Sequence, residues 1–188
     1  MIRRGVIDDL TRARPRLYLP AVRSFRIGQG FDVHPFADGR RLMLAGVEVP
    51  GARGLAGHSD ADAALHAVTD ALLGAIGAGD IGRHFPDSDP RHAGRASADF
   101  VRTAMGEVRA RGYRVANADV TILAEAPRLA PLLDRMRAVV AELLDVPLDA
   151  ANVKATRGEG LGAIGRGEGI AAQAIVLLER DDQAVGDG

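Results

Sequence analysis

Residues 25–34 read FRIGQGFDVH, and with this stretch a regular pattern begins in the chain. Its aromatic and β-branched residues are typical of a strand, so we expect the first strand at Phe25–His34. A second strand is expected at Leu42–Val49, with Gly39 in the turn between them. The residues before this stretch, Met1–Ser24, show no sustained apolar period, which predicts a flexible leader or linker.

Helical spacing is clearest in the segment that follows. From about Asp60 to Ala78, apolar side chains recur every three or four residues, which predicts an amphipathic helix. Two further helices are expected, Ser97–Arg111 with Ser97 as its N-cap and Leu129–Leu144. The remaining expected elements are strands at Tyr113–Leu123, Asn152–Thr156 and Gly169–Leu178 and a loop at Gly79–Gly94.

The order of these elements indicates the fold class. Strands and helices mix without strict alternation, and the glycine-rich segment 157–168 joins the last two strands without a helix. We therefore expect an α+β fold, a sandwich in which helices cover one face of a mixed β-sheet. It forms a single domain at residues 25–180, followed by a polar tail at residues 181–188 that is expected to be disordered.

Composition excludes several classes of function. A net charge of −1 and a pI near 6.5 provide no broad cationic field, so neither nucleic acid nor a membrane surface is an expected partner. No run of about 18 apolar residues and no signal peptide are recognisable, which predicts a soluble, unsecreted, cytoplasmic protein. Without cysteine, any metal must be held by His, Asp or Glu.

A metal site is indicated by the end of the first strand. Asp32 and His34 are two residues apart, so in a strand their side chains share a face. His66 from the first helix would add a third ligand, and three N and O ligands describe an open catalytic zinc site. The alternative is a capping Asp beside a solvated His. Asp62 and Asp70 flank His66 at four-residue spacing, and either one is expected to orient its second ring nitrogen unless the stripe is a solvent face.

Several motifs in order resemble one family. Residues 28–34 (GQGFDVH), 58–75 (HSDADAALHAVTDALLGA), 79–82 (GDIG) and 85–90 (FPDSDP) are similar to the 2-C-methyl-D-erythritol 2,4-cyclodiphosphate synthase family. The similarity covers residues 26–178. It implies a homotrimer whose active sites lie between subunits, with one zinc ion per subunit.

The resemblance also implies roles for residues in the first half of the chain. Asp32, His34 and His66 would be the zinc ligands, and His58 would stabilise the transition state from a loop that meets the phosphates. The alternative for His58 is a surface-loop imidazole. Asp80 and Gly82 would hold substrate hydroxyls, beneath a flap at Phe85–Asp89. The implied substrate contacts here are Asp32, Val33, His34, His58, Ser59, Asp80, Ile81, Gly82, Phe85, Pro86, Asp87, Ser88 and Asp89.

The second half of the chain carries the implied nucleotide contacts. Residues 124–130 (AEAPRLA) resemble the cytidine-binding segment, and they also suit a strand-to-helix turn with Pro near its start. The segments 153–159 and 165–169 resemble the phosphate-contacting terminus, with Glu159 as the ligand of a second divalent ion and Arg166 as an ionic contact. The implied contacts are Ala124, Glu125, Ala126, Pro127, Arg128, Leu129, Ala130, Thr156, Arg157, Gly158, Glu159, Ala163 and Arg166.

Three positions depart from the family pattern. The family has consecutive threonines where Arg157 and Gly158 stand, and often a bulky residue where Ala163 stands. We expect Arg157 to act catalytically, contacting phosphate in place of a hydroxyl. Residues 160–165 match G-x-G-x-x-G, but the strand that follows them excludes dinucleotide binding.

The reaction implied by the resemblance is cyclisation of a cytidine diphosphate. The substrate would be 4-diphosphocytidyl-2-C-methyl-D-erythritol 2-phosphate, and the products 2-C-methyl-D-erythritol 2,4-cyclodiphosphate and CMP. Zinc would act together with Mg²⁺ or Mn²⁺ on the substrate diphosphate. Two alternatives are a zinc-dependent phosphohydrolase, which would release a linear product, and a non-catalytic trimer that binds isoprenoid diphosphates without releasing CMP.

Overall fold

A five-stranded mixed sheet forms the framework of the described chain. The computed structural model describes residues 24–86, 89 and 94–180. The strands lie in the order β4-β1-β7-β5-β6, and only the pair β5 and β6 is parallel. Their bounds are β1 Phe25–Ala37, β4 Gly54–Leu55, β5 Tyr113–Leu123, β6 Ala151–Thr156 and β7 Gly169–Arg180.

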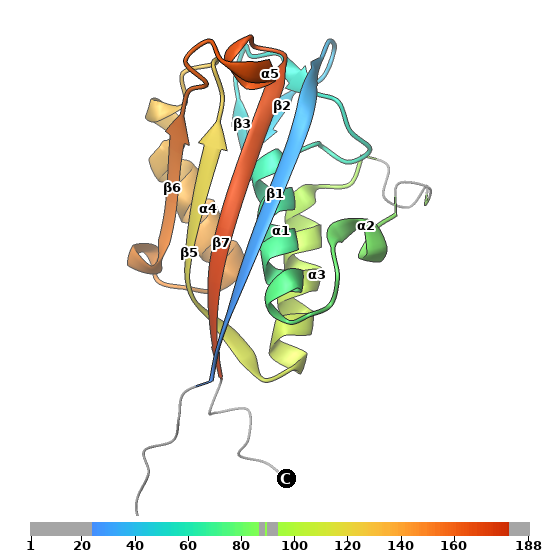
Figure 1. The fold of residues 1–188 in the computed structure, drawn as a ribbon, viewed down its shortest axis with the longest axis vertical. Coiled ribbons are helices and arrows are strands. Elements are labelled where there is room, and N and C mark those ends of the chain that lie inside the picture. The colour runs from blue at the N-terminus through green and yellow to red at the C-terminus, as the bar shows by residue number, and fades with distance from the viewer. Residues whose placement is uncertain (1–23, 87–88, 90–93, 181–188) are drawn as a thin grey trace, which may run out of the picture.

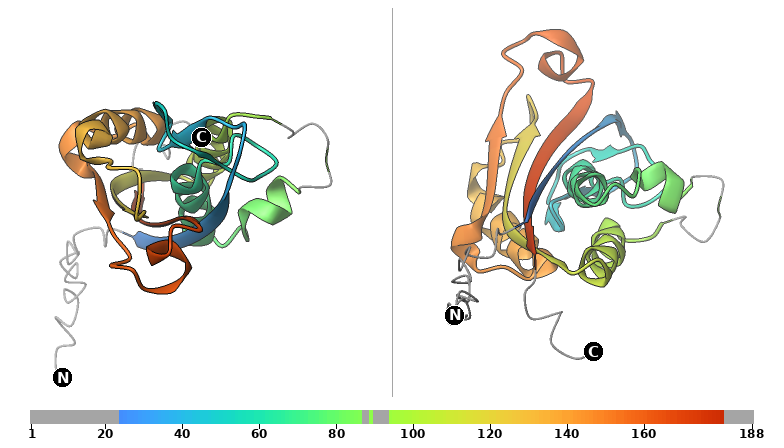
Figure 2. Two further views of the ribbon diagram at one scale, coloured as in Figure 1. Left: turned by 90° about the horizontal axis from the view of Figure 1, so that it is seen from above. Right: turned by 60° about the horizontal axis from the view of Figure 1, so that its bottom comes forward.

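Helices cover one face of this sheet, as Figures 1 and 2 show. α1 (Ala63–Ala75) packs on β1 and β7, and α4 (Leu133–Leu144) packs on β6. α3 (Ser97–Ala110) lies against α1. The sheet face toward the helices carries the buried aliphatic side chains, while alternate residues of β1 face away from the helices. The expected α+β class with a mixed sheet is confirmed.

Short elements differ from the sequence-based prediction. The strand expected at residues 42–49 is a hairpin of β2 (Leu42–Leu44) and β3 (Val47–Val49). Its two turn residues, Ala45 and Gly46, both have positive φ, which suits a tight hairpin turn. The single-turn helices are α2 Ile81–His84, η2 Ala130–Leu132, η3 Leu148–Ala150 and α5 Gly162–Gly165. α2 and α5 lie where only loops were expected.

Ser97 is not the N-cap of α3. That position is Ala96, which makes no side-chain capping bond. The Ser97 N–H instead donates to Asp60 Oδ1 at 3.1 Å, so a carboxylate from a distant segment satisfies the first turn. The prediction was wrong because the sequence next to a helix can reveal only a cap that comes from that same stretch, and Asp60 comes from a segment 37 residues earlier.

α1 and β1 approach each other more closely than side chains on the strand would allow. A Cβ added at Gly28 would lie 1.9 Å from the carbonyl oxygen of Ala71, and one added at Gly30 would lie 2.0 Å from that of Ala67. Glycine at both positions therefore lets the helix backbone rest on the strand backbone. His66 is thereby brought opposite the end of β1.

The expected leader at residues 1–24 lies outside the described residues except for Ser24. The expected tail at residues 181–188 lies outside them entirely. Ser24 is described, and its carbonyl accepts the Arg180 N–H at 3.0 Å, so it extends the pairing of β1 with β7. Among the described helices, none has the length and apolar composition needed to cross a membrane.

Asp62 fixes the start of α1. It is fully buried and is the N-cap, with Oδ1 accepting the N–H of Leu65 at 3.1 Å and of Ala45 at 2.8 Å. Its Oδ2 accepts the Gly46 N–H at 2.6 Å. One carboxylate therefore satisfies both a helix N-terminus and the β2–β3 turn.

We expect Asp62→Ala to lower the free energy of unfolding by about 3 kcal/mol or more, because two buried N–H groups and the partly buried Gly46 N–H lose their acceptor. Urea denaturation followed by circular dichroism measures the change. Glu142→Ala, on the exposed side of α4, is the control and should change stability by about 0.5 kcal/mol or less. A similar small loss in both variants would contradict the anchoring role of Asp62.

Candidate metal centre and a second pocket

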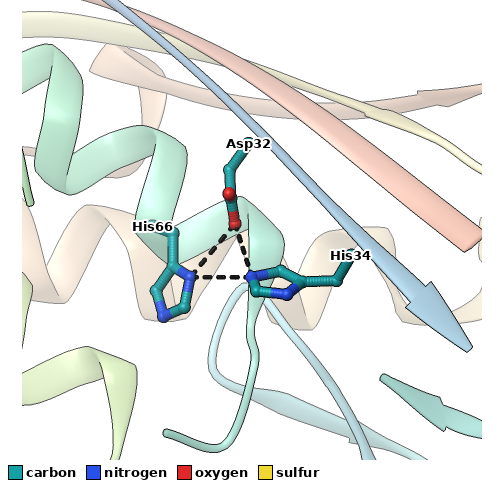
Figure 3. Close-up of side chains that lie close together, drawn as sticks. All are labelled: Asp32, His34 and His66. Atoms are coloured by element: carbon teal, nitrogen blue, oxygen red, sulfur yellow. Dashed lines mark hydrogen bonds and ion pairs between the residues drawn. The ribbon is translucent and has the colours of Figure 1, made fainter. Parts of the chain in front are cut away.

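Three side chains converge at the end of β1 that faces α1 (Figure 3). Asp32 and His34 extend from the same face of β1, and His66 extends from α1. Asp32 Oδ2 lies 2.9 Å from His34 Nε2 and 3.0 Å from His66 Nδ1, and the two ring nitrogens are 3.1 Å apart. The three predicted zinc ligands therefore form one compact group of donor atoms.

The charges within this group stabilise one another. Burial would raise the pKa of Asp32, but its hydrogen bonds with the His34 and His66 rings outweigh burial and hold that pKa well below its usual range. Burial likewise opposes protonation of His34, yet the hydrogen bond to Asp32 raises the pKa of the imidazole. Asp32 is thus held as a carboxylate anion, the charge in this group that can attract a metal cation.

The donor set fits a divalent metal ion. His66 Nε2 lies 2.9 Å from Ser97 Oγ and 3.0 Å from Ser59 Oγ. When Nε2 donates to one of these hydroxyls, His66 Nδ1, which faces the group, is available as a lone-pair donor. Two imidazoles and one carboxylate with no thiolate suit zinc in an open site.

The expectation that Asp62 or Asp70 orients His66 is wrong. Asp62 is occupied by backbone N–H groups, and Asp70 Oδ1 accepts the Ile81 N–H at 2.7 Å. Burial, the largest effect, raises the pKa of both carboxyls. Two hydroxyls take the position beside His66 Nε2, because the helix turns both aspartates toward other backbone segments.

A cavity of about 190 Å³ lies beside the three donors. It brings together most residues that the resemblance implies for the first half of the chain. Its lining residues are Asp32, His34, Gly57, His58, Ser59, His66, Ile81, Gly82, Phe85 and Phe100. Asp80 is exposed and caps α2 by accepting the Arg83 N–H at 2.9 Å. The Val33 side chain is 52% exposed on the other face of β1, so it does not line the cavity.

The base of the expected flap is fixed by aromatic packing. The Phe85 ring stacks on Phe100 with centroids 4.5 Å apart, and the Arg95 guanidinium lies 5.2 Å from the Phe100 centroid. Pro86 follows Phe85 at the surface, and its carbonyl accepts the Asp89 N–H at 2.9 Å. Asp87 and Ser88 lie outside the described residues.

Several residues at this cavity were not predicted. Phe100 lines it from α3, and Arg40 donates to the carbonyl oxygens of Gly57 and Ser59 and so ties down the loop beside it. Arg40 lies near a turn, and Phe100 follows the helical period of α3. Neither position carries a local signal of function, because the contact exists only in three dimensions.

A second cavity of about 440 Å³ lies where β5 and β6 end. The parallel pairing of these strands places the segment after Leu123 beside Thr156. The lining residues are Ala124, Glu125, Pro127, Arg128, Leu129, Ala130, Ala155, Thr156 and Arg157. Ala126 lines a smaller neighbouring cavity of about 270 Å³. The predicted nucleotide-contacting segments thus come together, as their strand ends require.

Arg157 is paired within the chain at the edge of this cavity. Its Nε donates to Glu125 Oε1 at 3.0 Å, Nη2 donates to the same oxygen, and Glu125 Oε2 accepts the Gly158 N–H at 3.1 Å. The hydrogen bond from Arg157 is the main reason that the pKa of Glu125 is lowered. The side chain is therefore held across the two strand ends.

Among the implied contacts in the second half of the chain, five do not line either large cavity: Ala126, Gly158, Glu159, Ala163 and Arg166. Glu159 is exposed with φ of 50°, Ala163 is exposed in α5, and Arg166 Nε donates to Glu168 Oε1 at 2.6 Å. In addition, none of the described residues lines both the 190 Å³ and the 440 Å³ cavities. The two groups of contacts are separated within one chain, with β7 between β1 and β5.

Comparison with known proteins confirms the resemblance. The model of the YgbB family matches residues 25–179. The 2-C-methyl-D-erythritol 2,4-cyclodiphosphate synthase of Geobacillus kaustophilus is 59% identical over 156 residues, which cover 83% of this chain and 99% of that protein. The bifunctional IspDF of Campylobacter jejuni matches with a TM-score of 0.81 and 40% identity over 84% of this chain and 43% of its own.

A solved 2-C-methyl-D-erythritol 2,4-cyclodiphosphate synthase in its CDP-bound form shares the fold. Its TM-score is 0.75 and its identity 42%, over 81% of this chain and 99% of that chain. Sequence and fold thus agree over nearly all the described residues. The chain therefore belongs to the YgbB family, the family of the 2-C-methyl-D-erythritol 2,4-cyclodiphosphate synthases.

Proposed function

We propose that this enzyme converts 4-diphosphocytidyl-2-C-methyl-D-erythritol 2-phosphate to 2-C-methyl-D-erythritol 2,4-cyclodiphosphate and CMP, in the non-mevalonate route to isoprenoids. The observation that carries the proposal is the Asp32, His34 and His66 group beside a cavity, in a chain 59% identical to a protein named for this reaction. By reaction type it is a phosphorus–oxygen lyase, and we place it in the cytoplasm.

The chemistry is a phosphoryl transfer within one substrate. An oxygen of the 2-phosphate forms a bond to the phosphorus distal to cytidine, and the bond from that phosphorus to the bridging oxygen breaks, so that CMP leaves with the oxygen. Zinc at the three donors would supply positive charge at the attacked phosphate. His58 and Ser59, which line the same cavity, would align the phosphate and stabilise the developing charge.

The second cavity is the proposed nucleotide site. A related structure holds CDP, and the cavity formed by residues 124–130 and 155–157 has backbone groups of a strand-to-helix turn at its edge. Glu159 would hold the Mg²⁺ or Mn²⁺ ion that supplies positive charge to the substrate diphosphate, with Arg166 as an ionic contact near Ala163. Asp80 and Gly82 would hold the hydroxyls of the methylerythritol part.

We infer a homotrimer with active sites between subunits. The sheet face opposite the helices carries a group of exposed apolar side chains, and such a patch favours association. Its members are Phe25, Ile27, Phe31, Val33 and Ile175. The separation of the two cavities within one chain also supports this arrangement, since a neighbouring subunit can bring its second cavity to the metal group.

Phosphorus NMR of the substrate with protein, zinc and Mg²⁺ tests the proposed reaction. We expect cyclic diphosphate and CMP to appear together at equal rates. Appearance of a linear phosphate product would instead indicate a phosphohydrolase, and a bound substrate that releases no CMP would indicate a non-catalytic binding protein. Either result would refute the cyclisation.

His66→Ala should lose zinc and activity together, because two remaining protein ligands hold the ion weakly. Elemental analysis and the rate of CMP release measure the two losses. His84→Ala removes an imidazole that contacts Ala78 and Glu107 outside the metal group, and it should keep zinc. Full zinc occupancy in His66→Ala would remove this residue from the ligand set.

Arg157 is the departure from the family pattern that most needs a test. We propose that it contacts the substrate diphosphate, and the pair with Glu125 would hold the guanidinium at the cavity edge until substrate binds. Arg157→Ala should then lower kcat about 10²-fold or more, and Arg157→Thr should restore part of the loss. Parental kcat and KM in both variants would exclude the contact.

The pair itself has a separate readout. Arg157 lowers the pKa of Glu125 in the folded protein. The contribution of this ion pair to stability is therefore present above the pKa of Glu125 in the unfolded chain, and it is lost as pH falls through the pKa of Glu125 in the folded protein. Arg157→Ala should therefore raise the pKa of Glu125 in a carbon-13 NMR titration. This shift shows whether the pair forms, independently of the effect on kcat.

A further inference from the structure

A buried chain of hydrogen bonds lies on the side of His66 that faces away from the metal group. His66 Nε2 is 2.9 Å from Ser97 Oγ, and the Ser97 hydroxyl donates to Asp60 Oδ1. Ser97 is fully buried, and His66 is 9% exposed. The three groups come from α1, from the first residue of α3 and from the segment before α1, so only the folded chain brings them together.

The direction of these bonds follows from the number of hydrogens available. A serine hydroxyl has one hydrogen, and at Ser97 it goes to the Asp60 carboxylate. The Ser97 oxygen can then only accept from His66, so the imidazole hydrogen is on Nε2. Nδ1 keeps its lone pair, and Nδ1 is the atom that lies 3.0 Å from Asp32 and 3.1 Å from His34.

Asp60 is itself held in place from three directions. Its Oδ1 also accepts the Ser97 N–H at 3.1 Å and the Asp62 N–H at 3.4 Å, and its own N–H donates to the Arg95 carbonyl at 3.1 Å. Because the Asp60 carboxylate is itself fixed, it fixes the direction in which the Ser97 hydroxyl donates its hydrogen. Ser97 does not act as the N-cap of α3, which is the usual role of a serine at the start of a helix, because Ala96 occupies that position.

We infer that Ser97 and Asp60 are positioning residues that set the tautomer and ring orientation of His66 for metal binding through Nδ1. This inference rests on the proposed metal centre. A carboxylate that acts on a ligand imidazole through one hydroxyl increases the basicity of the ligand nitrogen and limits ring rotation. A carboxylate was expected beside His66. We infer that Asp60 takes this role, acting on His66 through the Ser97 hydroxyl and not by direct contact.

Ser59 is the rival partner of the same ring nitrogen. Its Oγ lies 3.0 Å from His66 Nε2, but it also accepts the Ala61 N–H at 3.1 Å. The Ser59 Oγ is also 3.4 Å from Ser97 Oγ, so Ser59 belongs to the same network and cannot serve as a control. The control is Thr69, a fully buried hydroxyl of α1 that donates to the Leu65 carbonyl at 2.8 Å.

The test is the zinc affinity of each metal-free variant, measured by competition with a chelating dye at one pH. Ser97→Ala and Asp60→Asn should each weaken zinc binding about 10- to 100-fold, and the double variant about as much as one of them, because they act in series. Thr69→Val should change the affinity less than 3-fold. Circular dichroism and the melting temperature of the metal-free proteins monitor folding.

The outcomes separate the inference from the proposed function. If the parent protein binds no zinc, the proposed metal centre is wrong. If the parent binds zinc and Ser97→Ala and Asp60→Asn match it, or if Thr69→Val is equally impaired, the positioning role is overturned.

A second measurement needs no variant to fold. In the zinc-loaded parent at pH 8, nitrogen-15 NMR should show the hydrogen of His66 on Nε2. A hydrogen on Nδ1 would overturn the inference whatever the affinities show.

Discussion

The close contact between the α1 and β1 backbones is the constraint on which the rest of the structure depends. Gly28 and Gly30 leave no room for a side chain between strand and helix, and the helix carbonyls lie where a Cβ would be. The strand then continues directly into Asp32 and His34, while the helix presents His66 at the same level. Because the two backbones lie so close, the side chains of Asp32, His34 and His66 can bring their donor atoms together between strand and helix.

The segment before α1 turns this contact into a defined site. Ser59, Asp60 and Asp62 each use a side-chain oxygen to hold backbone or hydroxyl hydrogens, at the starts of α1 and α3 and at the β2–β3 turn. Ala61 lies among them with φ of 57°, a conformation that a non-glycine residue keeps only when its neighbours are fixed. The loop that lines the cavity is therefore part of the same rigid unit as the metal group.

Much of this arrangement can be predicted from the sequence, for identifiable reasons. Period-two and helical patterns locate β1, α1 and β5, and the two-residue spacing of Asp32 and His34 places both on one face. Roles for the second cavity came from the family resemblance, since spacing alone does not show that residues 124–130 and 155–157 meet. The turn at Ala45 and the partner of Ser97 were missed, because both are set by contacts with Asp62 and Asp60 far away in the chain.

We propose that close packing of α1 on β1 creates a metal site with a defined set of donor atoms. Anomalous diffraction at the zinc absorption edge, from crystals grown with zinc, tests this proposal most directly. We expect one strong peak within bonding distance of Asp32 Oδ2, His34 Nε2 and His66 Nδ1. The absence of a peak there at full zinc loading, or a peak bonded through His66 Nε2, would contradict it.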